Sequence, residues 1–312
     1  MTVSVSPADT ENIGTENAVT ENAVIEQVAE KTDAAANESS RRRRRWSPTA
    51  RPWGLYLSFL VVALAVLWAV VPGVFAPGSP IDAVPADKLL PPSAAHWFGT
   101  DTLGRDLFGR VVHGAVHSLS GALIAVTVGL ALGTLIGAVA GALGGMIDDI
   151  LMRVVDVLLA IPGLLLSLSV IILLGFGTVN AAIAVGLGSV AAFARLMRAE
   201  VARVRRTEYV EAAYGSGGTF VTVLRRHVLP NSLTPIAALA ALQFGTAILA
   251  ISTLGFLGYG APPPTPEWGL LIAEGRNYVA TAWWLTALPG LVVVAVVLSA
   301  NRISHRLGRN VR

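Results

Sequence analysis

The sequence predicts an all-α integral membrane protein with six transmembrane helices. Hydrophobic residues make up 54% of the 312 residues, charged residues only 14%, and the mean hydropathy is +0.63. A soluble domain carries about 25% charged residues. Several uncharged stretches also reach the roughly 20 residues that a helix needs to cross about 30 Å of hydrocarbon. These observations exclude a protein made only of soluble domains.

The first 45 residues form an acidic tail with a basic end. A Thr-Glu-Asn triplet recurs every five residues from Thr10, and eight acidic residues against one lysine give residues 1–40 a net charge of −7. We expect this tail to be disordered, because it has few large apolar side chains to offset its ordering entropy. Arg41–Arg45 then precede the first apolar stretch, where arginines hold the cytosolic end of a span and meet anionic lipid. Membrane anchoring is therefore preferred to nucleic-acid binding for this run.

Six stretches with few or no charges follow the tail. They lie at about 54–75, 118–143, 153–174, 180–197, 232–256 and 283–302. The chain thus divides into an N-terminal transmembrane helix at 46–76, an external loop at 77–117 and a membrane core at 118–312. Pro162 and Pro289 interrupt two spans, and we expect a static kink at each.

The distribution of basic residues sets the orientation of the spans. With the N-terminus placed in the cytosol, 18 arginines lie on the cytosolic side, and three arginines and one lysine lie outside. We therefore expect both termini to face the cytosol, together with the large internal loop between the fourth and fifth spans.

Small residues form a stripe along the second span. They recur every four residues, which places them on one helix face: Gly121, Ala125, Gly129, Gly133, Gly137, Gly141 and Gly145. Small residues in this register let another helix backbone approach closely. We expect Gly129, Gly133, Gly137 and Gly141 to be packing positions, against a helix of this chain or of a partner.

Several chemistries are not expected. The chain has no cysteine, and neither of its two lysines lies in the glycine-rich sequence of a P-loop. His113 and His117 lie four residues apart without an apparent third metal ligand. No charged side chain lies in the middle of a span, where ion-coupled transporters usually carry one. Gln243, the main polar residue at that depth, is interpreted as a helix-packing residue.

The internal loop at 198–230 combines small residues with arginines. It contains Glu211-Ala212-Ala213-Tyr214-Gly215-Ser216-Gly217 and ends in His227-Val228-Leu229-Pro230-Asn231. The pattern predicts a short helix, a glycine break and a second basic segment, which Pro230 ends just before the fifth span. By composition alone, an ordinary amphipathic surface loop fits equally well. A little earlier in the chain, Arg153 and Asp156 are expected to form a local ion pair.

The spacing of this loop resembles the EAA loop of ABC-importer permeases. That pattern is E-A-A, three residues, a glycine, nine residues, a usually apolar position, one residue, and L-P. The matching residues are Glu211, Ala212, Ala213, Gly217, Leu229 and Pro230, and His227 stands at the apolar position. Further segments resemble the C-type permeases of dipeptide and oligopeptide importers: Phe98–Asp101, Gly104–Asp106, Arg153–Pro162, Leu254–Gly260 and Pro262–Gly269.

The resemblance implies a five-helix type I ABC-importer permease core behind one N-terminal helix, in a bacterial inner membrane. It implies half of a translocation pathway for di- or oligopeptides. The implied partners are a B-type permease subunit, cytosolic ABC ATPases, an external peptide-binding protein and membrane lipid. ATP and Mg²⁺ would be bound by the ATPases, with no cofactor, metal or catalytic residue in this chain. The matching loop residues would form the docking site for an ATPase.

Two alternatives stay open at this point. The first is a permease of the same architecture that imports nickel chelates or another small solute, because the motifs also resemble those permeases. A protein of a different class, an ion-coupled secondary transporter that works alone, is the second alternative.

Overall fold

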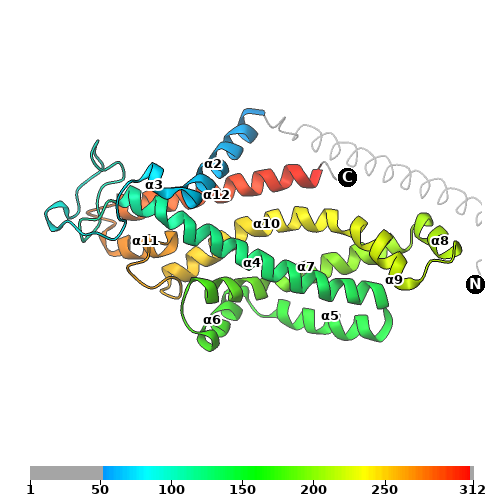
Figure 1. Ribbon diagram of the computed structural model, residues 1–312. Coiled ribbons are helices and arrows are strands. Elements are labelled where there is room, and N and C mark those ends of the chain that lie inside the picture. The colour runs from blue at the N-terminus through cyan, green and yellow to red at the C-terminus, as the bar shows by residue number, and fades with distance from the viewer. Residues whose placement is uncertain (1–51, 310–312) are drawn as a thin grey trace, which may run out of the picture. The chain divides into compact units, whose positions relative to one another are not determined.

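A computed structural model describes residues 52–309, so the tail and its arginine run lie outside the described residues. Every regular element within this range is a helix, and the predicted all-α membrane fold is confirmed (Figure 1). The helices are α2 (Pro52–Val70), α3 (Pro72–Phe75), α4 (Leu107–Leu143), α5 (Gly145–Ala160), α6 (Gly163–Leu174), α7 (Thr178–Arg205), α8 (Glu208–Gly215), α9 (Phe220–Val223), α10 (Leu229–Phe256), α11 (Trp268–Gly275) and α12 (Trp284–Arg309).

Five helical stretches are long and apolar enough to cross a membrane. They are Trp53–Val70, Leu107–Leu143, Thr178–Arg205, Phe220–Phe256 and Trp284–Arg306. The pair α5 and α6 passes the same criterion together and would make a sixth crossing. The second of these crossings, α4, begins at Leu107, inside the segment that the sequence assigns to an external loop.

The third predicted span, 153–174, is a broken helix and not one kinked rod. Helices α5 and α6 meet at an angle of 96°. Ile161, between them, has extended backbone angles (φ −87°, ψ 126°), as expected for a residue before proline. Pro162 also lacks the N–H that would continue the helix. Pro289, by contrast, lies inside α12, which continues through it.

The glycine stripe of α4 lies against α7 of the same chain. A Cβ atom on Gly133 would stand 2.5 Å from Phe193 Cβ, and one on Gly141 would stand 2.8 Å from the Arg198 carbonyl oxygen. Gly129 and Gly137 meet α7 in the same way, at Ser189 and at Ala194. In a membrane, such close packing matters because lipid tails are as apolar as the helix surfaces and give no hydrophobic drive to association.

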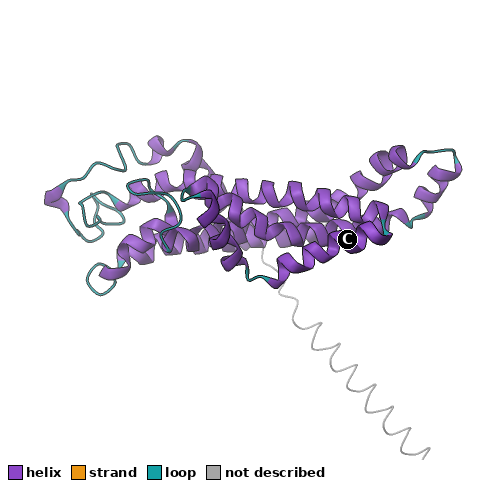
Figure 2. Cartoon of the chain, turned by 90° about the horizontal axis from the view of Figure 1, so that it is seen from below, coloured by secondary structure: helices purple, strands orange, loops and turns teal. Residues whose placement is uncertain are grey.

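The two ends of the bundle carry the irregular and polar segments. Figures 1 and 2 place α8 and α9 beyond the ends of α4 and α5, and we name this the α8 end. The opposite end, which we name the α11 end, carries α11 and the long loop of residues 76–106.

Candidate functional site

Helices α8 and α9 form a projecting hairpin, residues 208–223, that contains most of the predicted docking residues. Glu211 and Ala212 are exposed on α8, and Ala213 is half-buried and packs on the main core. Gly217 lies in the turn after α8 at φ +87°, a backbone conformation that only glycine adopts at little cost. Backbone hydrogen bonds close this turn, from Gly217 N to Tyr214 O at 2.9 Å and from Gly218 N to Ala213 O at 3.0 Å.

The hairpin is continuous with α10. A π-helical turn (Leu224–Val228) joins α9 to α10, and the Leu229 N–H donates to the Leu224 carbonyl, five residues back. The prediction that Pro230 ends this segment before the fifth span is therefore wrong. Pro230 is the second residue of α10, directly after the π turn, and the helix continues through it.

Buried valines attach the hairpin to the core. Val210, Val223 and Val228 are almost fully buried, and Leu229 packs beside them. The tip also exposes apolar side chains that sequence reasoning did not single out: Tyr209, Tyr214, Phe220 and Val221. Their clustering in an otherwise basic loop is the sequence signal by which they could have been identified. Aromatic side chains are enriched at protein–protein interfaces relative to the rest of the surface.

At the α11 end, a largely buried ion network joins the loop of residues 76–106 to α4 and α11. Arg110, fully buried, donates to Asp101 Oδ2 at 2.9 Å and to Glu274 Oε2 at 2.5 Å. Arg105 donates to the same Asp101 oxygen at 2.6 Å and lies 3.4 Å from Glu274. Two cations and two carboxylates thus neutralise one another; the side chains of Arg105, Arg110 and Asp101 are buried, and that of Glu274 is 28% exposed. Sequence reasoning missed this network.

Glu267 caps α11 from a buried position. Its carboxylate accepts hydrogen bonds from Gly269 N and Leu270 N, each at 2.9 Å, and from Ser118 Oγ of α4 at 3.2 Å. Burial raises the pKa of the Glu267 carboxyl, although the three hydrogen bonds oppose the shift. The neighbouring Trp268 is also buried and donates from Nε1 to the Val111 carbonyl.

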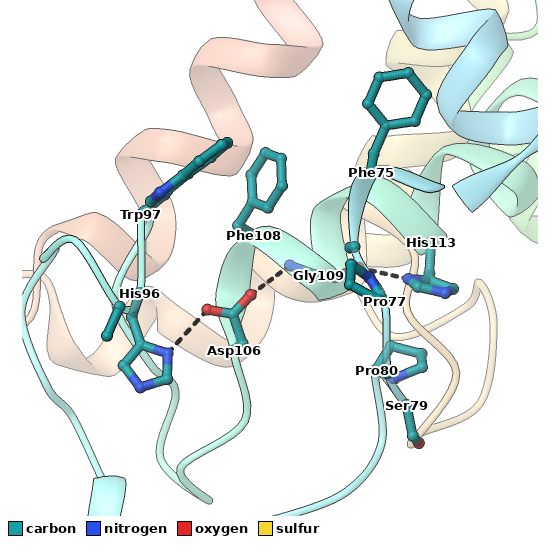
Figure 3. A pocket seen from close by; sticks show the side chains of 13 residues that line it. Phe75, Pro77, Ser79, Pro80, His96, Trp97, Asp106, Phe108, Gly109 and His113 are labelled. Atoms are coloured by element: carbon teal, nitrogen blue, oxygen red, sulfur yellow. Dashed lines mark hydrogen bonds and ion pairs between the residues drawn. The ribbon is translucent and has the colours of Figure 1, made fainter. Parts of the chain in front are cut away.

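Figure 3 shows an open pocket at the same end, beside the first turn of α4. Its volume is about 290 Å³. Asp106 lies at its centre, accepting from Gly109 N at 2.7 Å and pairing with His96 Nδ1 at 3.1 Å. Trp97 and Phe108, 5.0 Å apart between ring centroids, form an aromatic wall. The pocket is thus lined by aromatic rings and by one carboxylate that is bonded within the chain.

Two expectations about charged and metal-binding residues can be compared with the structure. The Asp156 carboxylate pairs with Arg195 of α7 at 2.6 Å, and not with Arg153, because α5 lies along α7. Across residues 52–309, no group of three metal-ligating side chains converges. His113 instead donates from Nδ1 to the Gly109 carbonyl, one turn earlier in α4.

A small cavity lies between the long helices. It has a volume of about 170 Å³ and is lined by parts of α4, α6, α7 and α10. Its polar lining side chains are Ser167, Ser189, Gln243 and Thr246. Gln243 Oε1 accepts a hydrogen bond from Thr246 Oγ1 on the same helix, at 3.1 Å. Hydroxyl and amide groups are thus available at membrane depth without a fixed charge.

The long apolar helices define a multi-span membrane protein, with an uncharged cavity among its helices and a hairpin that projects from one end. Residues 133–312 match the protein family described as binding-protein-dependent transport system inner membrane component. This chain belongs to that family. It is therefore a multi-pass permease subunit, and membership implies a substrate-binding protein and an ATPase as partners.

Named relatives and solved structures agree with this family. The chain is 39% identical to the dipeptide transport system permease protein of Alkalihalophilus pseudofirmus, covering 80% of this chain and 83% of that one. It is 37% identical to the di/tripeptide transport system permease protein of Pseudomonas aeruginosa, covering 84% and 88%. A glutathione transport system permease protein of Shigella flexneri is 44% identical, covering 69% and 71%.

The fold is similar to that of the MetNI methionine ABC transporter, solved in inward-facing conformations. The TM-score is 0.54 at 18% sequence identity, and the match covers 66% of this chain and 98% of that one. This likeness concerns the fold, and it covers nearly the whole of the solved chain.

Proposed function

We propose that this chain is the C-type permease subunit of an ATP-driven importer for di- or oligopeptides and forms half of its translocation pathway. The observation that carries the proposal is the agreement between relatives of 37–39% identity, aligned over most of both chains, that are named for dipeptides and for di- and tripeptides. The glutathione relative fits the same substrate class, because glutathione is itself a tripeptide. A nickel chelate or another small solute remains the alternative cargo.

The remaining subunits follow from this role. A B-type permease would supply the other half of the pathway, and an external binding protein would deliver the peptide. ATP and Mg²⁺ would be bound and used by cytosolic ATPases, so that this chain carries neither a cofactor nor a catalytic residue. The ion-coupled alternative loses its basis, since members of this family depend on a binding protein.

The charge distribution supports one topology. We place the α8 end and both termini in the cytosol, because 18 arginines fall on that side, against three arginines and one lysine on the other. The α11 end then faces the binding protein. The pocket around Asp106 and the half-exposed Glu274 belong to this external surface.

The hairpin is proposed as the ATPase-docking element. Ala212 and Ala213 leave room for a close approach, and Glu211 is available to pair with a basic group of the partner. The exposed aromatic residues of the tip would surround this contact. Since the hairpin continues through the π turn into α10, a displacement of α8 would tilt or rotate a membrane-spanning helix and not be lost in a loose loop.

Uptake measurements test the substrate class. A strain that lacks this chain should lose uptake of a labelled dipeptide, a tetrapeptide or glutathione, and regain it when the chain is restored. Uptake should depend on ATP and persist when the membrane potential is collapsed by an ionophore. Loss of nickel uptake with unchanged uptake of all three peptides would overturn the peptide assignment.

A further inference from the structure

A charged cavity opens at the α8 end, between the turn that joins α4 to α5 and the last turns of α7. Its volume is about 570 Å³. Arg198, Arg205 and Arg206 line it together with Asp148, so its lining carries two net positive charges. Gly144 and Gly145, at the start of α5, form the opposite wall. A cavity with this charge favours an anionic ligand.

The arginines keep donors for such a ligand. Arg198 Nη2 donates to Asp148 Oδ2 at 2.5 Å, and Arg205 Nη1 donates to the Gly141 carbonyl at 2.9 Å. A guanidinium group carries five N–H donors, so one bond to the protein leaves most of them unused. Planar guanidinium groups match the oxygens of a phosphate in particular. The chemistry of the cavity therefore fits a phosphate ester.

Asp148 adds a requirement for a hydrogen-bond donor. Its Oδ1 atom is buried and has no hydrogen-bond partner among the described residues, whereas Oδ2 is held by Arg198. An unpaired buried acceptor of this kind is costly, and a ligand hydroxyl would satisfy it. The ligand is thus expected to carry a hydroxyl group close to its phosphate.

An apolar ridge adjoins the cavity. Leu143, the last residue of α4, and Met146, near the start of α5, flank the cavity-lining Gly144 and Gly145 in the chain, and Ile147 and Ile150 follow on α5. All four side chains are between 45% and 78% exposed. A soluble phosphate compound would leave this ridge bare, whereas the acyl chains of a lipid would cover it. Basic pockets between transmembrane helices on the cytosolic side are suited to anionic headgroups.

We propose that this cavity is a binding site for an anionic phospholipid with a hydroxylated headgroup, of the phosphatidylglycerol type. The phosphate lies among Arg198, Arg205 and Arg206, a headgroup hydroxyl donates to Asp148 Oδ1, and the acyl chains lie along the Leu143–Ile150 ridge. The lipid thereby bridges the α4–α5 turn and the end of α7, next to the α8–α9 hairpin.

The test uses the importer complex purified in detergent through a tag on this chain. Binding of phosphatidylglycerol, phosphatidylcholine of equal chain length and free glycerol phosphate is measured by native mass spectrometry and by the shift in melting temperature. Arg206→Gln is the test variant, because its side chain lines the cavity and is exposed. Arg203→Gln is the matched control, because Arg203 is an exposed arginine three residues earlier that pairs with Glu200 and does not line the cavity.

The wild-type complex and the Arg203→Gln variant are expected to bind phosphatidylglycerol in preference to both other probes. Arg206→Gln should bind it about five-fold more weakly, the effect of about one surface arginine. Met146→Gln, on the ridge, should weaken binding of the lipid and leave glycerol phosphate unaffected. Equal binding of the two lipids, equal binding of glycerol phosphate and phosphatidylglycerol, or an equal loss in both arginine variants would overturn the proposal.

Discussion

Gly133 of α4 lies against the main chain of Val190 in α7, so closely that a Cβ atom on the glycine would stand 2.5 Å from the valine carbonyl oxygen. Real Cβ atoms do not approach a backbone oxygen to this distance, and the backbone of a packed helix cannot move aside as a flexible side chain would. The close packing of α4 on α7 therefore depends on the absence of a side chain at Gly133.

Replacing Gly133 by alanine should destabilise the bundle. Overpacking of this kind costs about 1–3 kcal/mol, and we expect a matching loss in the free energy of unfolding of the purified complex. Gly188→Ala, in α7, is the control, since a Cβ there meets nothing within 4 Å and alanine has the better helix propensity. Equal stability of both variants would show that α4 and α7 separate easily at Gly133.

A bulky residue on the exposed face of α8 should block coupling without unfolding the protein. Ala212→Trp adds an indole where the side chain is exposed, so the spans should assemble while ATPase association or transport-coupled hydrolysis is lost. Asp149→Trp, exposed on α5 at the same end, controls for the added indole. Ala213→Trp is a less selective change, because Ala213 already packs on the core. Normal transport by Ala212→Trp would argue against docking at this face.

The ion network at the α11 end should be sensitive to the loss of one partner. Asp101→Asn keeps the hydrogen-bond acceptor but leaves the buried guanidinium of Arg110 with less counter-charge. Breaking a buried pair in this way costs about 3–5 kcal/mol. Thermal unfolding of the purified complex measures the loss, and Asp82→Asn, an exposed carboxylate of the same loop, should change it little.

Glu267 should make stability depend on pH. Its pKa is raised in the folded protein above the ordinary value of 4.5, so the folded state holds the proton more tightly than the unfolded state does. The favourable contribution is complete below 4.5 and is lost as the pH rises through the raised pKa. Relative to Glu267→Gln, which does not titrate, the wild-type melting temperature should fall over this window. A constant difference between the two proteins would contradict the shift.

Cysteine labelling should distinguish the two ends of the molecule. The chain has no native cysteine, so single substitutions report without background. An impermeant maleimide applied to intact spheroplasts should label Ser93→Cys, at the α11 end, and leave Ser216→Cys, in the hairpin turn, unlabelled. Both should react once the membrane is permeabilised. Labelling of Ser216→Cys in intact spheroplasts would reverse the proposed topology.

The sequence predicts most of the fold because its strongest signals are local. Hydropathy located the spans, and the four-residue register placed Gly133 and Gly137 on one face. That face had to pack on something, but only the three-dimensional structure identifies α7 as the neighbour. The bend at Pro162 had a local signal, yet a proline is compatible with a kink or with a full break, and the extended Ile161 decides between them.

The polar contacts of the candidate sites were harder to predict from the sequence. Arg110 and Glu274 are 164 positions apart in sequence, so no local pattern joins them. The sequence also assigns Arg110 to an external loop, where an arginine needs no partner. In the structure Arg110 is buried in the first turn of α4, and a buried charge requires a counter-charge. The residues proposed for docking, from Glu211 to Gly217, were singled out by their spacing. The continuity of their hairpin with α10 depends on the π turn, which has no comparable sequence signal.

The π turn between α9 and α10 sets the angle of the hairpin around the axis of α10. Successive residues of an α-helix are separated by about 100° around its axis, and a π turn contains one residue more than an α turn. The number of residues in Leu224–Val228 therefore sets the direction in which Ala212 faces around the axis of α10. The identity of the side chains in that turn does not. Removal of a single residue from this turn would swing the hairpin by about 100° and turn an unaltered docking face away from its partner.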